Sequence, residues 1–306
     1  MKMLFTSDTH VLPGHLTRLL KAAVELRPEL MVLGGDLIPD WRRTIRDSIP
    51  SHRTWVREKF LPALQKFHDS FPWMRIFLDL GNDDLAAAAP LLEARDGIDF
   101  ELLHMRVAEL GPRLALVGYM TVNPTPFLIK DREKPDCRDW TGLDVTGVRK
   151  EGAATVSGAE SSVALDPASG TMEDDLDLLS GLLTSSRWEH HDFLFVSHCP
   201  PRGTALDLTS MHTHVGSIAV RRFIERWSAT GRLRASFHGH IHESPWMSGR
   251  VMQSFGATPA FNVGQDSQVL HALLLDTDDP AATARRVTID RSGIPALGIS
   301  ASGVDT

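Results

Sequence analysis

Short apolar runs that lead into polar residues are the feature that most limits the fold of this sequence. Three of them occupy residues 3–7, 30–37 and 73–84, and each ends in, or is followed by, Asp, Asn or Gly. Helix-like stretches separate the runs, and strands that alternate with helices are typical of an α/β sheet. Because chemistry in such sheets collects at the carboxyl ends of the strands, the pattern also predicts a functional edge.

The stretches between the apolar runs predict helices. Residues 15–27 carry Leu and Ala near helical spacing before Pro28, and residues 51–71 predict a second helix that Pro62 kinks or breaks. Later parts of the chain predict antiparallel strands across 100–122, helices at 173–188 and 216–229, and strands within 191–201, 232–244, 250–265 and 267–277. No internal repeat or linker divides the chain.

Two segments depart from this pattern. Residues 123–172 are rich in Pro, Gly, Ser, Asp and Thr and have no periodicity, which predicts a lid or insertion. Residues 291–306 are small and polar, and we expect a poorly ordered tail. The sequence thus predicts a single domain over residues 1–290, interrupted at 123–172.

Charge and cysteine content restrict the partners and the compartment. The chain has 32 Lys and Arg against 39 Asp and Glu, a net charge of −7, which predicts no strong footprint for nucleic acid. Cys137 and Cys199 have no metal-binding spacing and fit a reducing compartment. The apolar run at the N-terminus is too short for a signal peptide, and no run approaches a membrane span. We expect a cytoplasmic protein with no membrane partner.

Five polar stretches at predicted strand ends contain candidate metal ligands. They are Asp8–His10, Gly35–Asp36, Gly81–Asp84, Ser197–Pro201 and His238–His242. Each has an ordinary alternative explanation, since Gly-Asp and Gly-Asn are common in turns and an isolated His is often a surface or core residue. Their joint occurrence in one α/β fold favours a metal site.

Seven side chains in these stretches offer oxygen or nitrogen ligands: Asp8, His10, Asp36, Asn82, His198, His240 and His242. Seven ligands are too many for one tetrahedral zinc and suit two divalent ions that share a carboxylate. Without cysteine ligands, Mn²⁺ or iron is favoured ahead of Zn²⁺. Alternation along a strand would place Asp8 and His10 on one face. It would do the same for His240 and His242, with His238 one step deeper in the strand.

The ordered motifs resemble those of the calcineurin-like metallophosphoesterase superfamily. Here they read DTH (Asp8–His10), GDLIPD (Gly35–Asp40), GNDD (Gly81–Asp84), SHCPP (Ser197–Pro201) and GHIH (Gly239–His242). The resemblance implies a four-layer α-β-β-α sandwich, two metal ions and hydrolysis of a small phosphoester. It also implies that one ion is held by Asp8, His10, Asp36 and His242. The other would be held by Asp36, Asn82, His198 and His240, with Asp36 bridging.

The sequence departs from the family pattern at two positions. Asp40 lies one residue further from Asp36 than the second acid of the family, so no role is carried over to it. Asp83 stands where many members have a His that helps the leaving group depart. A carboxylate of ordinary pKa is ionised near neutral pH, so Asp83 should be a poor acid and should disfavour dianionic monoesters. A phosphodiesterase is therefore expected, with Asp83 among the catalytic residues and Asn82 also contacting substrate.

Two further histidines precede a predicted helix that begins near Ser217. The stretch from His212 resembles that of poorly defined prokaryotic phosphoesterases, which makes His214 a catalytic candidate and His212 a substrate-binding candidate. The alternative is an exposed pair of histidines with no role. For the whole protein the alternatives are a phosphomonoesterase or a non-catalytic interaction scaffold on the same fold, and the sequence does not indicate an oligomeric state.

Overall fold

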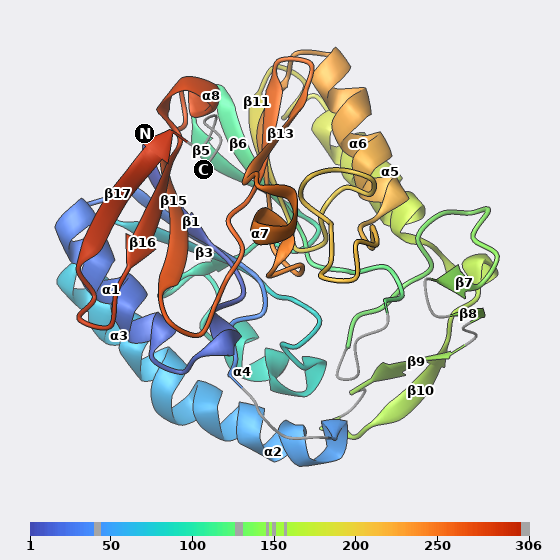
Figure 1. Ribbon diagram of the computed structural model, residues 1–306, viewed down its shortest axis with the longest axis horizontal. Helices are drawn as coiled ribbons and strands as arrows, with labels where there is room; N and C mark the ends of the chain where they lie inside the picture. The colour runs from blue at the N-terminus through green and yellow to red at the C-terminus, as the bar shows by residue number, and fades with distance from the viewer. Residues whose placement is uncertain (40–43, 126–130, 145–146, 149–150, 156–157, 301–306) are drawn as a thin grey trace.

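Two β-sheets face each other at the centre of the molecule, and helices cover the outer side of each (Figure 1). This computed structural model describes residues 1–39, 44–125, 131–144, 147–148, 151–155 and 158–300. Within these residues, the first sheet has seven strands in the order β17-β16-β15-β1-β2-β3-β4, and the second has six in the order β13-β14-β12-β11-β6-β5. The predicted four-layer α-β-β-α sandwich is confirmed.

Parallel strands form one half of the first sheet, and antiparallel strands form the other half. The parallel strands are β1 (Lys2–Thr6), β2 (Leu30–Gly34), β3 (Arg75–Asp79) and β4 (Glu101–Leu102). The antiparallel strands are β15 (Leu270–Asp276), β16 (Arg285–Ile289) and β17 (Pro295–Ser300). Every residue of β2 is buried, because the sheet is covered on both faces, and a continuous apolar run is what such a strand needs.

The second sheet is also mostly parallel. Its strands are β5 (Arg106–Gly111), β6 (Leu114–Tyr119), β11 (Asp192–Ser197), β12 (Leu233–His238), β13 (Met252–Phe255) and β14 (Thr258–Asn262). Strands β6, β11, β12 and β14 run parallel, whereas β5 and β13 pair antiparallel at the two edges. The hairpin of β5 and β6, which turns at Pro112, confirms antiparallel strands within residues 100–122, whereas β4 in the same range pairs in parallel with β3.

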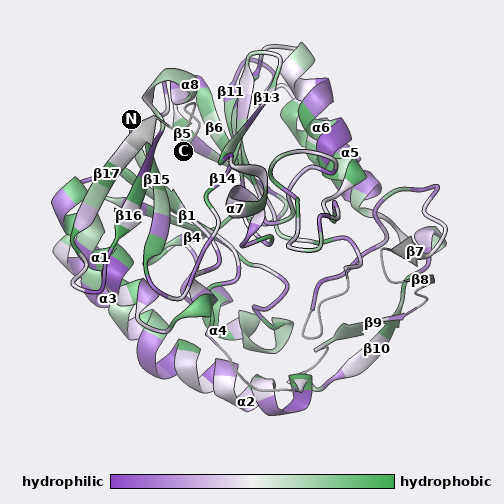
Figure 2. Cartoon of the chain, in the orientation of Figure 1, coloured by the Kyte–Doolittle hydropathy of each residue, from purple (hydrophilic) through white to green (hydrophobic). Residues whose placement is uncertain are grey.

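Apolar side chains fill three layers between these elements. In the middle layer, Phe5 of β1 and Phe237 of β12 join the two sheets, with ring centroids 5.2 Å apart. The outer layers lie beneath helices α1 (His15–Leu26) and α3 (Leu61–Ser70) and beneath α5 (Met172–Leu183) and α6 (Ile218–Ala229). Hydrophobic and hydrophilic residues alternate along these helices, as amphipathic helices require (Figure 2). Each sheet is therefore packed against helices on its outer face and against the other sheet on its inner face, which fixes the positions of the strand ends.

The second predicted helix begins earlier than expected and contains a widened turn. Helix α2 (Ile45–Trp55) starts at the cap Thr44, whose hydroxyl oxygen accepts a hydrogen bond from the amide of Asp47. A π-helical turn, η2 (Val56–Phe60), then leads into α3. Pro62 lies in the first turn of α3, where a residue without an N–H group is tolerated because the helical hydrogen bonding has already been interrupted.

Shorter elements complete the described chain. They are η1 (Thr9–Val11), η3 (Ala86–Ala88), α4 (Ala89–Glu93), η5 (Pro167–Ser169), α7 (Ser244–Ser248) and α8 (Pro280–Thr283). Across the residues that the structure describes, no helix combines the length and the apolar character that a membrane span requires. Both cysteines are free and buried.

The insertion and the tail differ from each other. The described parts of 123–172 form two short hairpins beside the main sheets, β7 (Leu143–Asp144) with β8 (Gly147–Val148) and β9 (Glu151–Ala154) with β10 (Ser161–Ala164) (Figure 1). The expectation of a poorly ordered tail was wrong for β17, which pairs with β16. Strand β16 would otherwise be a sheet edge with unpaired backbone groups, and β17 satisfies them. Residues 301–306 lie outside the described chain.

Candidate metal centre

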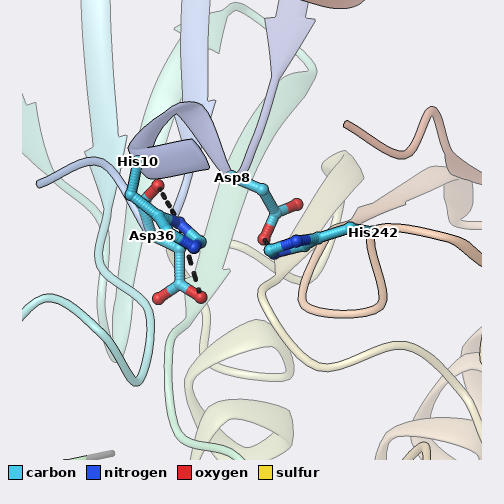
Figure 3. Close-up of side chains that lie close together, drawn as sticks. All are labelled: Asp8, His10, Asp36 and His242. Atoms are coloured by element: carbon cyan, nitrogen blue, oxygen red, sulfur yellow. Dashed lines mark hydrogen bonds and ion pairs between the residues drawn. The ribbon is translucent and has the colours of Figure 1, made fainter. Parts of the chain in front are cut away.

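Six of the seven predicted ligands lie in two clusters that have one residue in common. Asp36 belongs to both clusters. The first consists of Asp8, His10, Asp36 and His242 (Figure 3), and the second of Asp36, His198 and His240. Within each cluster, one ligand atom per residue lies within 4.8 Å of all the others. Loops that follow β1 and β2 of the first sheet meet loops that follow β11 and β12 of the second. The site therefore lies at the carboxyl ends of these strands, at the edge where the two sheets meet.

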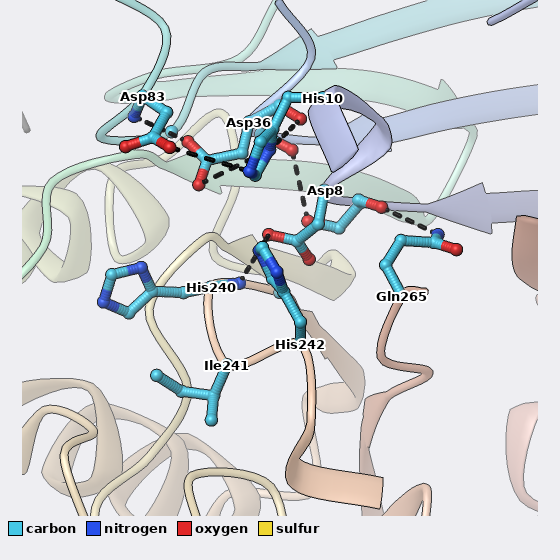
Figure 4. A network of polar contacts seen from close by, with 12 residues as sticks. Asp8, His10, Asp36, Asp83, His240, Ile241, His242 and Gln265 are labelled. Carbon is cyan, nitrogen blue, oxygen red and sulfur yellow. Dashed lines mark hydrogen bonds and ion pairs between the residues drawn. The ribbon is translucent and has the colours of Figure 1, made fainter. Parts of the chain in front are cut away.

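Asp8 and His242 form the ion pair on one side of the first cluster. His242 Nε2 lies 3.3 Å from Asp8 Oδ1, and the same oxygen accepts a hydrogen bond of 2.9 Å from the amide of His240 (Figure 4). Burial raises the pKa of Asp8, but the nearby His242 and His198 lower it, and the net shift is downward. Burial lowers the pKa of His242, but Asp8 raises it to about 8.

Asp36 is the centre of the site. Its Oδ2 lies 3.1 Å from Nε2 of His198, and its Oδ1 accepts a hydrogen bond of 2.8 Å from the amide of Asp83. Burial opposes its negative charge, but His198 lowers the pKa of Asp36 well below its usual range. The reverse holds for His198, where burial lowers the pKa but Asp36 raises it to about 10. Each charge is therefore stabilised by its partner in a site from which water is excluded.

Glycine permits the close approach of Asp36 to His198. Gly35 has a φ of 101°, and a Cβ atom there would lie 2.5 Å from Nδ1 of His198. That nitrogen is itself 2.9 Å from the carbonyl oxygen of Gly34, a contact that leaves Nε2 facing Asp36. The Gly-Asp motif thus reflects a packing requirement of the site as well as a turn preference.

Strand alternation does not explain how the ligands meet, and this part of the sequence analysis was wrong. Asp8 has a φ of 58° and ends β1 abruptly, so His10 lies in the 3-10 turn η1 rather than on a strand. His240 has a φ of 69° and follows the end of β12. Left-handed residues reverse the chain directly after a buried strand, and Asp and His adopt this conformation more readily than most residues. Each pair converges for that reason.

Asn82 supplies the observation that tests whether divalent ions fit. Its Oδ1 is buried and, among the described residues, has no hydrogen-bond partner, while its Nδ2 donates to Asp83 Oδ1 over 2.9 Å. A buried amide oxygen without a partner is costly unless something else binds it. Carboxylate, imidazole and amide donors without thiolates suit hard or borderline divalent ions. The residues present therefore fit the metals that the motifs imply.

Asp83 lies at the rim of the first cluster. Its Oδ2 is 3.6 Å from Nε2 of His10, and its side chain is 31% exposed. Burial and the neighbouring Asp36 carboxylate raise the pKa of Asp83 to about 7. A carboxylate close to another carboxylate binds a proton more readily than a solvated one, whereas bound divalent ions would favour its ionised form. The expectation of an ionised Asp83 beside two ions therefore stays a prediction.

The neighbouring Asp84 joins two loops through hydrogen bonds to their backbone amides. Its two carboxylate oxygens accept hydrogen bonds of 2.8 to 2.9 Å from the amides of Leu37, Ile38 and Gly81. These bonds join the loop after β2 to the loop after β3. Asp84 thus holds Asp36 and Asn82 on facing loops. Asp40 lies outside the described residues.

The other histidines do not join the clusters. His238 is fully buried, with its ring nitrogens 3.0 Å from Ser197 O and 3.1 Å from Ser236 Oγ, and burial lowers its pKa to about 4. His214 Nδ1 lies 2.8 Å from Oδ1 of the buried Asp207, and its side chain is 43% exposed. His212 is exposed. Within the described residues, neither His212 nor His214 is part of a ligand cluster.

Sequence reasoning missed two supporting residues. Asp207 orients His214 but stands alone in the sequence, without a motif. Gln265 Nε2 donates to the carbonyl oxygen of Ser7 over 3.0 Å and to that of His271 over 2.9 Å, and so holds the end of β1 next to Asp8 (Figure 4). A lone Gln after the last motif carries no signal that would have identified it.

The sequence model of the calcineurin-like phosphoesterases matches residues 1–244 of this chain. The chain belongs to the calcineurin-like phosphoesterase family. It is a metal-dependent phosphoric ester hydrolase, and the resemblance carried by the five motifs is confirmed. Among curated proteins, no sequence matches this family member significantly.

Solved structures resemble this phosphoesterase at low sequence identity. One aligns over 94% of this chain and 99% of its own, with 14% identity and a TM-score of 0.58. The TT1561 protein of Thermus thermophilus aligns over 97% of both chains, with 14% identity and a TM-score of 0.51. The calcineurin-like phosphoesterase YfkN of Bacillus subtilis aligns over 97% of this chain and 93% of its own, with 13% identity and a TM-score of 0.46. The first two show a common fold.

Proposed function

We propose that this phosphoesterase is a dinuclear-metal-dependent phosphodiesterase. The observation that carries the proposal is that Asp36 belongs to both ligand clusters. A carboxylate has two oxygens and can bridge two ions, whereas the remaining ligands divide between them. Asp8, His10 and His242 would complete the first set, and Asn82, His198 and His240 would complete the second. Mn²⁺ or iron is proposed ahead of Zn²⁺, because the set combines carboxylate and imidazole without thiolate.

When bound, a pair of divalent ions neutralises charge on the phosphoryl oxygens and lowers the pKa of a water molecule. The surrounding residues hold the ligand side chains in position. The amide of Asp83 holds Asp36 Oδ1, and the amide of His240 holds Asp8 Oδ1, so both carboxylates are fixed in advance. Preorganised groups of this kind need no rearrangement when charge develops in the transition state.

Asp83 favours a diester over a monoester. It stands at the rim of the first cluster, 3.6 Å from His10, where a substrate group next to the ions would lie. Bound cations favour the ionised form of a neighbouring carboxyl group, so they oppose the upward shift in the pKa of Asp83. An ionised Asp83 repels a dianionic monoester more strongly than a monoanionic diester. The alternative is a phosphomonoesterase, in which Asp83 would point away from the substrate.

The test compares p-nitrophenyl phosphate with bis-p-nitrophenyl phosphate on Mn²⁺-loaded protein. We expect the kcat/KM of the wild type to favour the diester, and Asp83→His to shift the ratio toward the monoester. The replacement also offers an imidazole that protonates poor leaving groups, so matched alkyl esters should gain as well. An unchanged ratio with intact metal content would contradict the assignment of Asp83, and a wild-type preference for monoesters would favour the alternative.

Two further roles are proposed around the site. Asp207 accepts the Nδ1 hydrogen of His214, which leaves Nε2 as the atom that exchanges a proton with a leaving group. Asn82 and the exposed His212 would contact the substrate. We also propose a cytoplasmic location, which the two free, buried cysteines support, and a role for residues 123–172 as a cover over the site.

A further inference from the structure

A buried aspartate of the insertion, Asp131, forms hydrogen bonds with the loop that carries Asn82. Asp131 is 3% exposed. Its amide donates a hydrogen bond of 2.7 Å to the carbonyl oxygen of Asn82. Its carboxylate Oδ2 accepts a hydrogen bond of 2.8 Å from the amide of Ala86. Asp131 therefore binds the loop on both sides of Asp83 and Asp84.

Thr155, which lies 24 positions after Asp131 in the insertion, completes this contact. It is 1% exposed, and both its amide, over 3.2 Å, and its hydroxyl donate to Oδ2 of Asp131. The hydroxyl oxygen in turn accepts a hydrogen bond of 2.9 Å from the amide of Ala87. The amides of Ala86 and Ala87 begin the 3-10 turn η3, and the first amides of a helical turn have no partner within it. Asp131 and Thr155 supply those partners.

A third residue reaches the same loop. The Nε atom of Arg132 donates a hydrogen bond of 3.2 Å to the carbonyl oxygen of Asp84. Asp131, Arg132 and Thr155, here called the clamp, thus bind backbone atoms over residues 82–87. The part of the insertion that forms the clamp is a fixed attachment beside the metal centre, whatever the rest of the segment does.

We propose that Asp131 is a positioning residue for the second metal ion. Asn82 Oδ1 has no hydrogen-bond partner in the described part of the chain, so its position depends on the backbone of Asn82 and on Asp83, to which its amide nitrogen donates. The clamp fixes that backbone at the carbonyl oxygen of Asn82. The first cluster takes no ligand from this loop and meets it only through Asp36, whose Oδ1 accepts the amide hydrogen of Asp83, so the clamp acts mainly on the second ion. This inference rests on the proposed two-ion function.

The test is a Mn²⁺ titration followed by electron paramagnetic resonance, made on variants that retain one cluster at a time. His242→Ala weakens the first cluster and His198→Ala the second. In the His242→Ala protein, adding Asp131→Asn should weaken the remaining Mn²⁺ site about 10–100-fold, the usual effect of losing a group that orients a ligand. In the His198→Ala protein, the same addition should weaken the remaining Mn²⁺ site much less, because this loop reaches the first cluster only through the amide of Asp83.

The matched control is Asp136→Asn. Asp136 is another buried carboxylate of the insertion, and it accepts hydrogen bonds of 2.7 Å and 3.1 Å from the amides of Ile218 and Ala219 at the start of α6. Its replacement should lower the midpoint of thermal unfolding without a selective change at either site. If Asp131→Asn fails to fold, Thr155→Val replaces it, and Thr155→Ser should restore the affinity.

The outcomes separate this inference from the proposed function. A wild type that binds one Mn²⁺ at saturation would contradict the two-ion function itself. A wild type that binds two, with Asp131→Asn weakening both sites equally or neither, would overturn the inference and leave the function standing. A selective loss at the second site, absent from Asp136→Asn, would support it.

Discussion

The two ligand clusters differ in their distance from solvent. In the first, the side chains of His10 and His242 are 12% and 29% exposed. In the second, the side chain of His198 is 0% exposed, and His240 is buried. Both clusters contain Asp36, so the difference in exposure arises from the surrounding loops and not from this common residue.

We propose from this difference that the buried cluster is a fixed part of the fold and that the more exposed cluster faces the substrate. Asp84 and the clamp bind the loop of Asn82, which we assign to the buried cluster, whereas Asp83 lies 3.6 Å from His10 of the first cluster. An ion in the buried cluster should exchange slowly, because its ligands must move before water reaches it. An ion in the first should exchange with solvent more readily.

The largest expected effect comes from the residue that the clusters have in common. Asp36→Asn should reduce kcat/KM by more than about 100-fold, beyond the 10–100-fold typical of residues that only orient a ligand. Loss of one anionic oxygen affects both ions, so the bound metal per chain should also fall at both sites. Elemental analysis after Mn²⁺ loading and desalting measures the metal content. Activity that survives with two bound ions would show that Asp36 does not bridge.

A smaller effect should distinguish the two clusters. The His198→Ala variant should lose the slowly exchanging ion of the buried cluster. The His242→Ala variant should lose the rapidly exchanging ion of the first cluster. Release of metal to a chelator is measured over time in both variants and in the wild type, where two phases are expected. A single phase in the wild type, or the same phase missing from both variants, would contradict the difference between the clusters.

The smallest effect concerns the glycine that admits His198. Gly35→Ala should destabilise the protein by about 1–3 kcal/mol, because it adds a strained φ and a contact with His198. It should also weaken the buried site selectively. Gly231→Ala is the control, since Gly231 has a φ of 75° and no atom lies within 4 Å of the added Cβ. Chemical denaturation and Mn²⁺ titration measure the two effects. Equal metal affinity in both variants would show that the packing at Gly35 does not shape the site.

Residue types and their order predicted which side chains cluster at the candidate metal centre, but not the way in which the backbone brings them together. Asp8 and His10 were identified from their chemistry, while the left-handed φ of Asp8 depends on the loop after β2, whose Gly35 carbonyl oxygen accepts the amide hydrogen of Asp8. The sheets were predictable because buried strands need apolar runs. Strand β17 was not, since small and polar residues at an edge pair through backbone atoms that every sequence carries.

The clamp is a second feature that the local sequence did not predict. Asp131 and Thr155 lie 24 positions apart in a sequence without periodicity, and each is an ordinary loop residue by composition. Their meeting depends on tertiary contacts with η3, which no local periodicity encodes. The raised pKa of Asp83 also follows from its burial and from the nearby Asp36, a residue 47 positions away, and so could not be predicted from its neighbours in the sequence.

The hydrogen bond between His240 and Asp8 joins residues 232 positions apart. Contacts of such long range form late in folding, because a large loop of chain must close first. On a ribosome, Asp8 is made 232 residues before His240, so the intervening chain must be synthesised before the two can meet. The first cluster is therefore assembled only when both sheets are in place. A metal ion would therefore bind there only after the domain has folded. Because it would bind the native state and not the unfolded chain, it would also stabilise the native state.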